Sequence, residues 1–220
     1  MRPNRPQRPR RINTAPALSL NPLLVLIVIN VVFYFATLVA PTGQYPWGTV
    51  HVINMDRITY YLGLIPYYVA DRPWTIITAM FLHANFTHIL FNMIALFFFG
   101  RTLRWFVGDN RFLFVYFIGG IVGNLAFWGL NQGQLSIAVG ASGAIFALAG
   151  ALVVIQPRMR IFFWGIIPMQ LWIFVVIFMG ILSIPGIAPS GIAWQAHLGG
   201  LVSGLAIGWF FRRRLRLFVI

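Results

Sequence analysis

The sequence predicts an all-α polytopic membrane protein with six transmembrane helices. Of its 220 residues, 60% are hydrophobic and only 9% are charged, and the mean hydropathy is +0.83. A soluble domain carries about 25% charged residues. The apolar runs of this chain are also long enough to cross a bilayer, which takes about 20 helical residues. The chain has no Cys, so disulfides, thiolate catalysis and Cys-bound metals are excluded.

The apolar runs define the expected spans in chain order. They are residues 23–40, 88–106, 112–130, 142–155, 161–184 and 192–211. We expect residues 1–21 to form a disordered basic cytoplasmic tail, 22–212 the membrane domain and 213–220 a second short basic tail. A cleaved signal peptide is the alternative for the first run. That run exceeds an h-region of about 7–15 residues and lacks a convincing cleavage site.

The arginines predict the orientation of these spans. The chain has no Lys, and its net charge of +13 therefore comes from Arg alone. Most arginines lie in the two tails and in the short connections after the second and fourth spans, whereas Arg57 and Arg72 on the opposite side are offset by Asp56 and Asp71. The positive-inside rule then places both termini in the cytoplasm. Topology explains this basicity better than nucleic-acid binding does.

The connection at 41–87 is too apolar for a solvated linker. It holds five of the seven tyrosines, with Trp47 and Trp74, and Gly63 and Pro66 interrupt it. Tyr and Trp favour the headgroup layer. We therefore expect a partly helical element that lies in the membrane interface, with a re-entrant hairpin as the alternative.

Three polar residues are expected at one depth. Ser142 is sixteen residues from Arg158, His197 fifteen from Arg212 and His88 sixteen from Arg104. At a rise of about 1.5 Å per residue, each stands roughly 22–24 Å above its cytoplasmic arginine. Ionisable groups inside spans are costly and usually functional. Ser142 would lie at the floor of a cavity open to the outside.

Helical spacing indicates which residues face one another. His197, Gly200 and Gly204 share a face, and the fourth span begins with Gly143 after Gly140. Small residues permit close backbone approach in membranes, which would bring His197 within about 3 Å of Ser142, as a general base requires. Each feature alone is more often structural: a packing serine, a dimerising glycine face or a hydrogen-bonded core histidine. Their common depth favours a catalytic site.

His88 and Asn92, at i and i+4, point the same way from the second span. With the Ser142 amide at a helix N-terminus, they could form an oxyanion hole. His51 and His83 lie in the 41–87 connection, and we expect His83 to tie that connection to the second span by a hydrogen bond.

Three motifs together resemble the rhomboid intramembrane serine proteases. They are Gly-Ala-Ser-Gly at 140–143, His-Ala-Asn-Phe-Thr-His-Ile-Leu-Phe-Asn at 83–92, and Ala-His-Leu-Gly-Gly at 196–200 followed by Gly204 and Gly208. The resemblance implies Ser142 as nucleophile, His197 as general base, and His88, Asn92 and the Ser142 amide as oxyanion donors. It also implies that His83 organises the first loop.

Two positions depart from the pattern of this family. Many members carry a Trp-Arg pair where this chain has Trp74 and Thr75, and a Glu near the end of the second span is here Arg104. Both lie outside the catalytic set. They affect the expected rigidity of the loop more than the expected activity.

The implied activity is cleavage of transmembrane protein substrates in or near the outer part of their helices, through a Ser–His dyad and an acyl-enzyme, without cofactor or metal. No Asp or Glu lies in any expected span, so packing or a neighbour such as Gln195 must orient His197. The expected location is a prokaryotic plasma membrane. The alternatives are an inactive rhomboid-like protein that binds membrane helices and a small transporter built on a broken helix.

Overall fold

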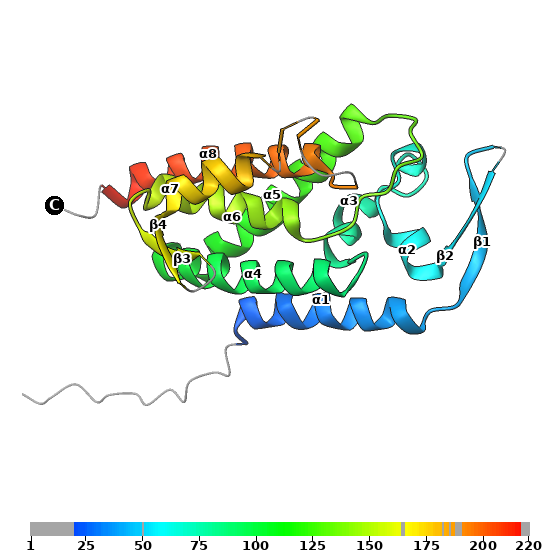
Figure 1. Cartoon of the computed structure of the whole chain (residues 1–220), viewed down its shortest axis with the longest axis horizontal. Coiled ribbons are helices and arrows are strands. Elements are labelled where there is room, and N and C mark those ends of the chain that lie inside the picture. The colour runs from blue at the N-terminus through cyan, green and yellow to red at the C-terminus, as the bar shows by residue number, and fades with distance from the viewer. Residues whose placement is uncertain are drawn as a thin grey trace, which may run out of the picture.

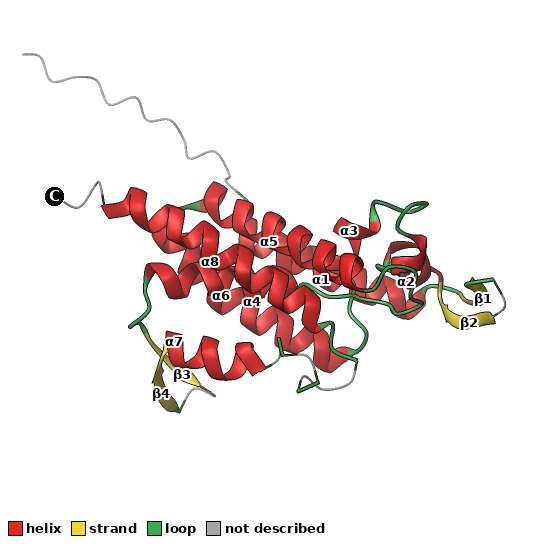
Figure 2. Ribbon diagram, turned by 90° about the horizontal axis from the view of Figure 1, so that it is seen from above, coloured by secondary structure: helices red, strands yellow, loops and turns green. Residues whose placement is uncertain are grey.

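The computed structural model describes residues 20–49, 51–163, 166–181, 183–184, 186–187 and 191–216, and within them the protein is mostly helical (Figures 1 and 2). Five long helices follow expected spans closely. They are α1 (Pro22–Val39), α4 (Phe86–Val107), α5 (Asp109–Leu130), α6 (Ser142–Ile155) and α8 (Trp194–Arg216). Of the expected N-terminal tail, residues 1–19 lie outside the described part.

Three of these helices, α1, α4 and α5, are long and apolar enough to cross a membrane, and α6 is a shorter apolar helix. The local sequence sets where they begin. The Asn21 side chain accepts a hydrogen bond from the Leu23 amide and Pro22 occupies the first turn of α1; both are favoured at a helix start. Asn85 caps α4 in the same way, by accepting from the His88 amide.

Helix α6 is the centre of the bundle, between α5, α8 and α4. Eleven of its residues are buried, from Gly143 to Ile155. Small side chains allow its neighbours to approach closely. A Cβ added at Gly119 of α5 would lie only 2.0 Å from the Ala147 Cβ. Such contacts between backbones replace the hydrophobic driving force that helices lack in lipid.

The connection between α1 and α4 is partly helical, as expected, with α2 (Arg57–Leu62), α3 (Thr75–Thr78) and the 3₁₀ turns η1 (Pro66–Tyr68) and η2 (Ala79–Phe81). It also contains an unpredicted antiparallel hairpin of β1 (Thr42–Trp47) and β2 (His51–Asp56). Exposed and half-buried residues alternate along β1, the period of a strand. The all-α expectation is therefore wrong for this segment.

The expected fifth span, residues 161–184, is also wrong at its first half. A second antiparallel hairpin, β3 (Arg160–Phe163) with β4 (Ile167–Gln170), precedes α7 (Leu171–Phe174) and the π-helical turn η3 (Val175–Met179). Pro168 pairs with Phe162 in this hairpin, and proline disfavours a continuous helix because it lacks the amide hydrogen. Figure 1 shows the two hairpins at opposite ends of the bundle.

Helix α8 continues to Arg216, beyond the expected boundary of the membrane domain at residue 212. The Arg213 guanidinium stacks on the Trp209 ring, 3.8 Å from its centroid. This i, i+4 contact supports the additional helical turn. Residues 217–220 of the expected second tail lie outside the described part.

Candidate active site

Ser142 and His197 meet at the interface of α6 and α8. Ser142 is the first residue of α6, and its Oγ lies 2.8 Å from Nε2 of His197. Both residues come from segments separated by 55 positions, and His197 is only 7% exposed. At an Oγ–Nε2 distance of 2.8 Å, an imidazole can take the hydroxyl proton as general base.

Phe146 holds the plane of the His197 ring. The two rings stack with centroids 4.1 Å apart and an interplanar angle of 15°. Phe146 lies one turn after Ser142 on α6, so one helix presents both the hydroxyl and the surface on which the base rests. Sequence reasoning missed Phe146, because an aromatic residue four positions after Ser142 in an apolar helix is also an ordinary core residue. Gln195, which the sequence suggested as an orienting residue, instead donates from Nε2 to Asn131 Oδ1 at 3.3 Å.

His88 of α4 lies beside the turn that leads into Ser142. A Cβ added at Gly140 would stand 2.8 Å from His88 Nε2 and 3.8 Å from Ser142 Oγ. The backbone φ of Gly140 is +125°, which a side chain rarely adopts, so glycine both permits the turn and makes room for the imidazole. The Ala84 amide donates to His88 Nδ1 at 3.4 Å. A neutral His88 therefore carries its hydrogen on Nε2, as a donor toward the site.

Asn92 is buried on the same helix as His88, but its hydrogen bond is local: Nδ2 donates to the His88 carbonyl at 2.8 Å. A primary amide has a second N–H to donate. On α6, the first helical bond runs from the Ile145 amide to the Ala141 carbonyl. The Ser142 amide consequently has no acceptor within the helix and is available for an anion.

The glycines of α8 explain how His197 comes so close to Ser142 on α6. A Cβ at Gly200 would lie 2.0 Å from the Gly143 carbonyl oxygen, and one at Gly204 would lie 2.1 Å from that of Ala147. Any side chain at these positions would have to displace the α6 backbone. The helix faces of small residues that the sequence predicted on α6 and α8 are thus in direct contact.

The segment that leads into Ser142 is held by the loop between α1 and α4. The Gly140 amide donates to the Ala79 carbonyl at 2.8 Å, and Leu64 pairs with Ala138 through two backbone bonds. On α5, Asn124 Nδ2 donates to the Ile76 carbonyl at 2.8 Å and fixes the loop from the other side. The loop therefore sets the position of the backbone turn before the nucleophile.

His83 is buried in this loop, and the expected hydrogen bond to the second span is absent: neither ring nitrogen has a hydrogen-bond partner among the described residues. Instead its ring packs edge to face against His88, with centroids 5.1 Å apart. Burial, and then the nearby His88, lower the pKa of His83 to about 3. His83 also lines a cavity of about 500 Å³ that extends to Asp56 and to Val139, three residues before Ser142.

Thr75 stands where many family members carry an arginine. In this chain another arginine of the same loop, Arg72, packs among its tyrosines. Its guanidinium lies 4.4 Å from the centroid of the Tyr60 ring and 4.6 Å from that of Tyr68, and Nη1 donates to the Tyr60 carbonyl at 2.9 Å. Thr75 itself is buried and its hydroxyl donates to the Arg72 carbonyl at 2.7 Å. A cation between aromatic faces stabilises such a cluster.

Fold and site together define a helical membrane protein with a serine hydroxyl and a histidine paired inside its bundle. A family model described as "Rhomboid domain" matches residues 70–214, and the chain belongs to the rhomboid family. The match includes α4, α5, α6 and nearly all of α8, and with them Ser142, His197, His88 and Asn92.

Three relatives show the extent of the similarity. The Bacillus subtilis (strain 168) rhomboid-family protein YdcA is 34% identical over 159 residues, 72% of this chain and 75% of the relative. Rhomboid protease AarA of Providencia stuartii is 28% identical over 219 residues, 87% of this chain and 72% of that protein. Rhomboid protease GluP of Bacillus subtilis (strain 168) is 33% identical, but over 60% of this chain and only 24% of GluP. The chain is thus an integral membrane protein of a family of intramembrane proteases.

Proposed function

We propose that this protein is a serine endopeptidase that cleaves transmembrane helices of membrane-protein substrates in or near their outer part, with Ser142 as nucleophile and His197 as general base. The observation that carries the proposal is the contact of 2.8 Å between Ser142 Oγ and His197 Nε2 at the end of α6. We also propose six spans, with both termini in the cytoplasm of a prokaryotic cell.

The chemistry follows from these two groups. Ser142 Oγ attacks the scissile carbonyl carbon while its proton passes to His197 Nε2. The oxyanion accepts hydrogen bonds from the Ser142 amide, His88 Nε2 and Asn92 Nδ2. Collapse breaks the C–N bond, His197 gives its proton to the leaving amine, and the acyl group remains as an ester on Ser142. Water then attacks this ester, with His197 again as base, and releases the carboxylic acid.

No carboxylate is needed to hold the imidazole in this scheme. The stacked Phe146 ring constrains its plane, and an offset or stacked aromatic pair is worth about 0.5–1.5 kcal/mol beyond burial. A substrate helix hides its peptide bonds in its own hydrogen bonds and must unwind before Ser142 can reach them. Residues that weaken helices, such as Gly, should therefore mark cleavage sites.

Serine-directed labelling tests the proposal. A fluorophosphonate should label the purified wild-type protein and not Ser142→Ala, and His197→Ala should label at most slowly because nucleophile and base act as a unit. Cleavage of a model transmembrane substrate in liposomes should be lost in both variants, with helical content unchanged by circular dichroism. Full cleavage by folded Ser142→Ala would remove the protease assignment to this residue.

A further inference from the structure

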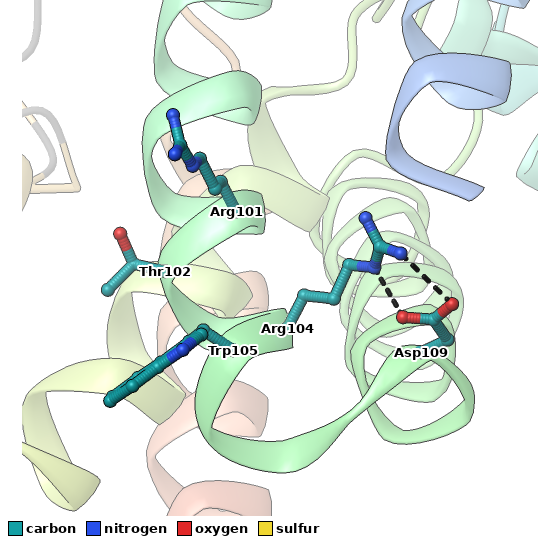
Figure 3. A pocket seen from close by; sticks show the side chains of 5 residues that line it. All are labelled: Arg101, Thr102, Arg104, Trp105 and Asp109. Atoms are coloured by element: carbon teal, nitrogen blue, oxygen red, sulfur yellow. Dashed lines mark hydrogen bonds and ion pairs between the residues drawn. The ribbon is translucent and has the colours of Figure 1, made fainter. Parts of the chain in front are cut away.

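A second site lies at the end of the bundle away from Ser142, where α4 turns into α5 (Figure 3). A cavity of about 640 Å³ is lined there by Arg101, Thr102, Arg104, Trp105 and Asp109. The proposed catalytic mechanism uses none of these residues. Arg104 replaces a Glu common in the family, so the replacement turns an acidic position into part of a basic cavity.

The cavity holds more positive than negative charge. Arg104 is fixed by a two-pronged ion pair with Asp109, and its Nη1 donates to Asn21 Oδ1 at 2.6 Å. The Arg101 guanidinium lies over the Phe97 ring, 5.9 Å from its centroid. The chain has only three acidic residues, and the other two, Asp56 and Asp71, lie in the loop at the opposite end of the bundle. Within the part of the chain that the structure describes, Arg101 therefore has no carboxylate partner.

The same face of α4 continues as an exposed apolar stripe. Leu90, Ile94 and Phe97 are 41%, 56% and 44% exposed and recur at helical spacing up to Arg101. Trp105, one turn beyond Arg101, is 80% exposed, and tryptophan favours the headgroup level of a bilayer. A soluble phosphate would use the arginines alone, whereas a phospholipid would use the arginines and the stripe together.

We propose that this cavity binds the headgroup of an anionic phospholipid, with its phosphate on Arg101, the polar substituent beyond the phosphate near Thr102 and Trp105, and an acyl chain along Leu90, Ile94 and Phe97. The Arg104–Asp109 pair keeps Arg104 in place as the second, weaker donor. Basic pockets between transmembrane helices are suited to such headgroups, and the arginine fork matches phosphate oxygens.

Native mass spectrometry of the purified protein in detergent can measure this binding with phosphatidylglycerol as the probe and phosphatidylcholine as the zwitterionic comparison. Arg101→Gln should weaken phosphatidylglycerol binding by about fivefold, the contribution of roughly one arginine at an anionic surface. Arg101→Lys should retain most of it. Phosphatidylcholine binding should change little in either variant.

Arg158→Gln is the matched control, because it removes the same charge from an exposed residue outside the cavity. Equal losses in Arg101→Gln and Arg158→Gln would overturn the site in favour of diffuse attraction, and so would unchanged binding in Arg101→Gln. Displacement of the lipid by excess inorganic phosphate would identify a site for soluble phosphates and also overturn the proposal. Serine labelling by the fluorophosphonate, measured in parallel, keeps this test separate from that of the protease assignment.

Discussion

At the scale of single residues, the site depends on which side chains touch the two reacting groups. Ser142 and His197 could be proposed from sequence because a serine between glycines and a membrane histidine are rare combinations with a common depth. Phe146 could not be singled out in the same way, since an aromatic residue in an apolar helix is ordinary core. Only the stacking of its ring at 4.1 Å from that of His197 distinguishes it.

Phe146→Leu should lower kcat for a model transmembrane substrate by about tenfold, because loss of the aromatic face frees the imidazole and small misplacements of a catalytic group are costly. KM should change less than kcat. Turnover in proteoliposomes, with the thermal unfolding midpoint measured alongside, checks this. Phe162→Leu, a similar change at an exposed residue of β3, should keep full activity. A normal kcat in Phe146→Leu would mean that His197 is oriented by other contacts.

His83 should make the fold sensitive to acid. Its pKa is about 3 in the folded protein against an ordinary value of 6.5, so the neutral form is favoured on folding. This stability is complete above about pH 6.5 and is lost progressively as the pH falls toward 3, because the unfolded chain binds the proton first. The unfolding midpoint of His83→Phe should therefore depend less on pH between about 6.5 and 4 than that of wild type.

His51→Phe provides the comparison for this titration, since His51 is exposed at the start of β2. It should follow the wild-type pH dependence. A His83→Phe variant whose midpoint falls with acid as steeply as that of wild type would assign the sensitivity to another group.

At the scale of elements, the long helices were predictable and the hairpins were not. The ends of α1, α5 and α6 fall within a few residues of the expected spans because apolar length and capping residues such as Asn21 act locally. The run at 161–170 is as apolar as a helix, and only Pro168 hints otherwise. Its pairing in β3 and β4 depends on contacts of Ile161 and Met169 with the bundle core, which composition does not reveal.

The contact of α6 with α8 can be tested by adding bulk on one face of α8. Gly200→Leu should reduce activity at least 10²-fold while all catalytic groups remain, because the Cβ alone would lie 2.0 Å from the Gly143 carbonyl oxygen and the helices must separate. Val202→Leu, on an exposed position of the same helix, should be tolerated. Substrate cleavage, with folding checked by resistance to added protease, distinguishes the two.

Wild-type cleavage by Gly200→Leu would show that α6 and α8 can separate without moving His197 away from Ser142. The geometry of the site would then rest on Phe146 and the loop between α1 and α4 rather than on the glycine contact.

At the scale of the whole molecule, the aromatic end that carries the connection between α1 and α4 is separated from a strongly basic opposite end. The sequence predicted this polarity from its arginines, and it predicted that the loop would be partly helical. It did not predict how that loop is fixed: Arg72 among tyrosines, and the bridge from Leu64 to Ala138. The bridge from Leu64 to Ala138 joins segments far apart in the chain, so no local pattern predicts it.

The proposed orientation can be measured because the chain has no Cys. A single Cys at exposed Thr49, in the turn between β1 and β2, should react with a membrane-impermeant maleimide added to intact cells. A single Cys at exposed Arg158 should react only after the membrane is permeabilised. The reverse labelling pattern would invert the topology and place cleavage at the cytoplasmic side.

The separation of Ser142 from His197 along the chain also has a consequence for biosynthesis. The histidine follows the serine by 55 residues, which at about 5–20 residues per second takes roughly 3–11 s to synthesise. During that interval Ser142 has already been synthesised and His197, its proposed base, has not. The proposed hydrolytic site therefore arises only when α8 packs against α6 and brings His197 to Ser142.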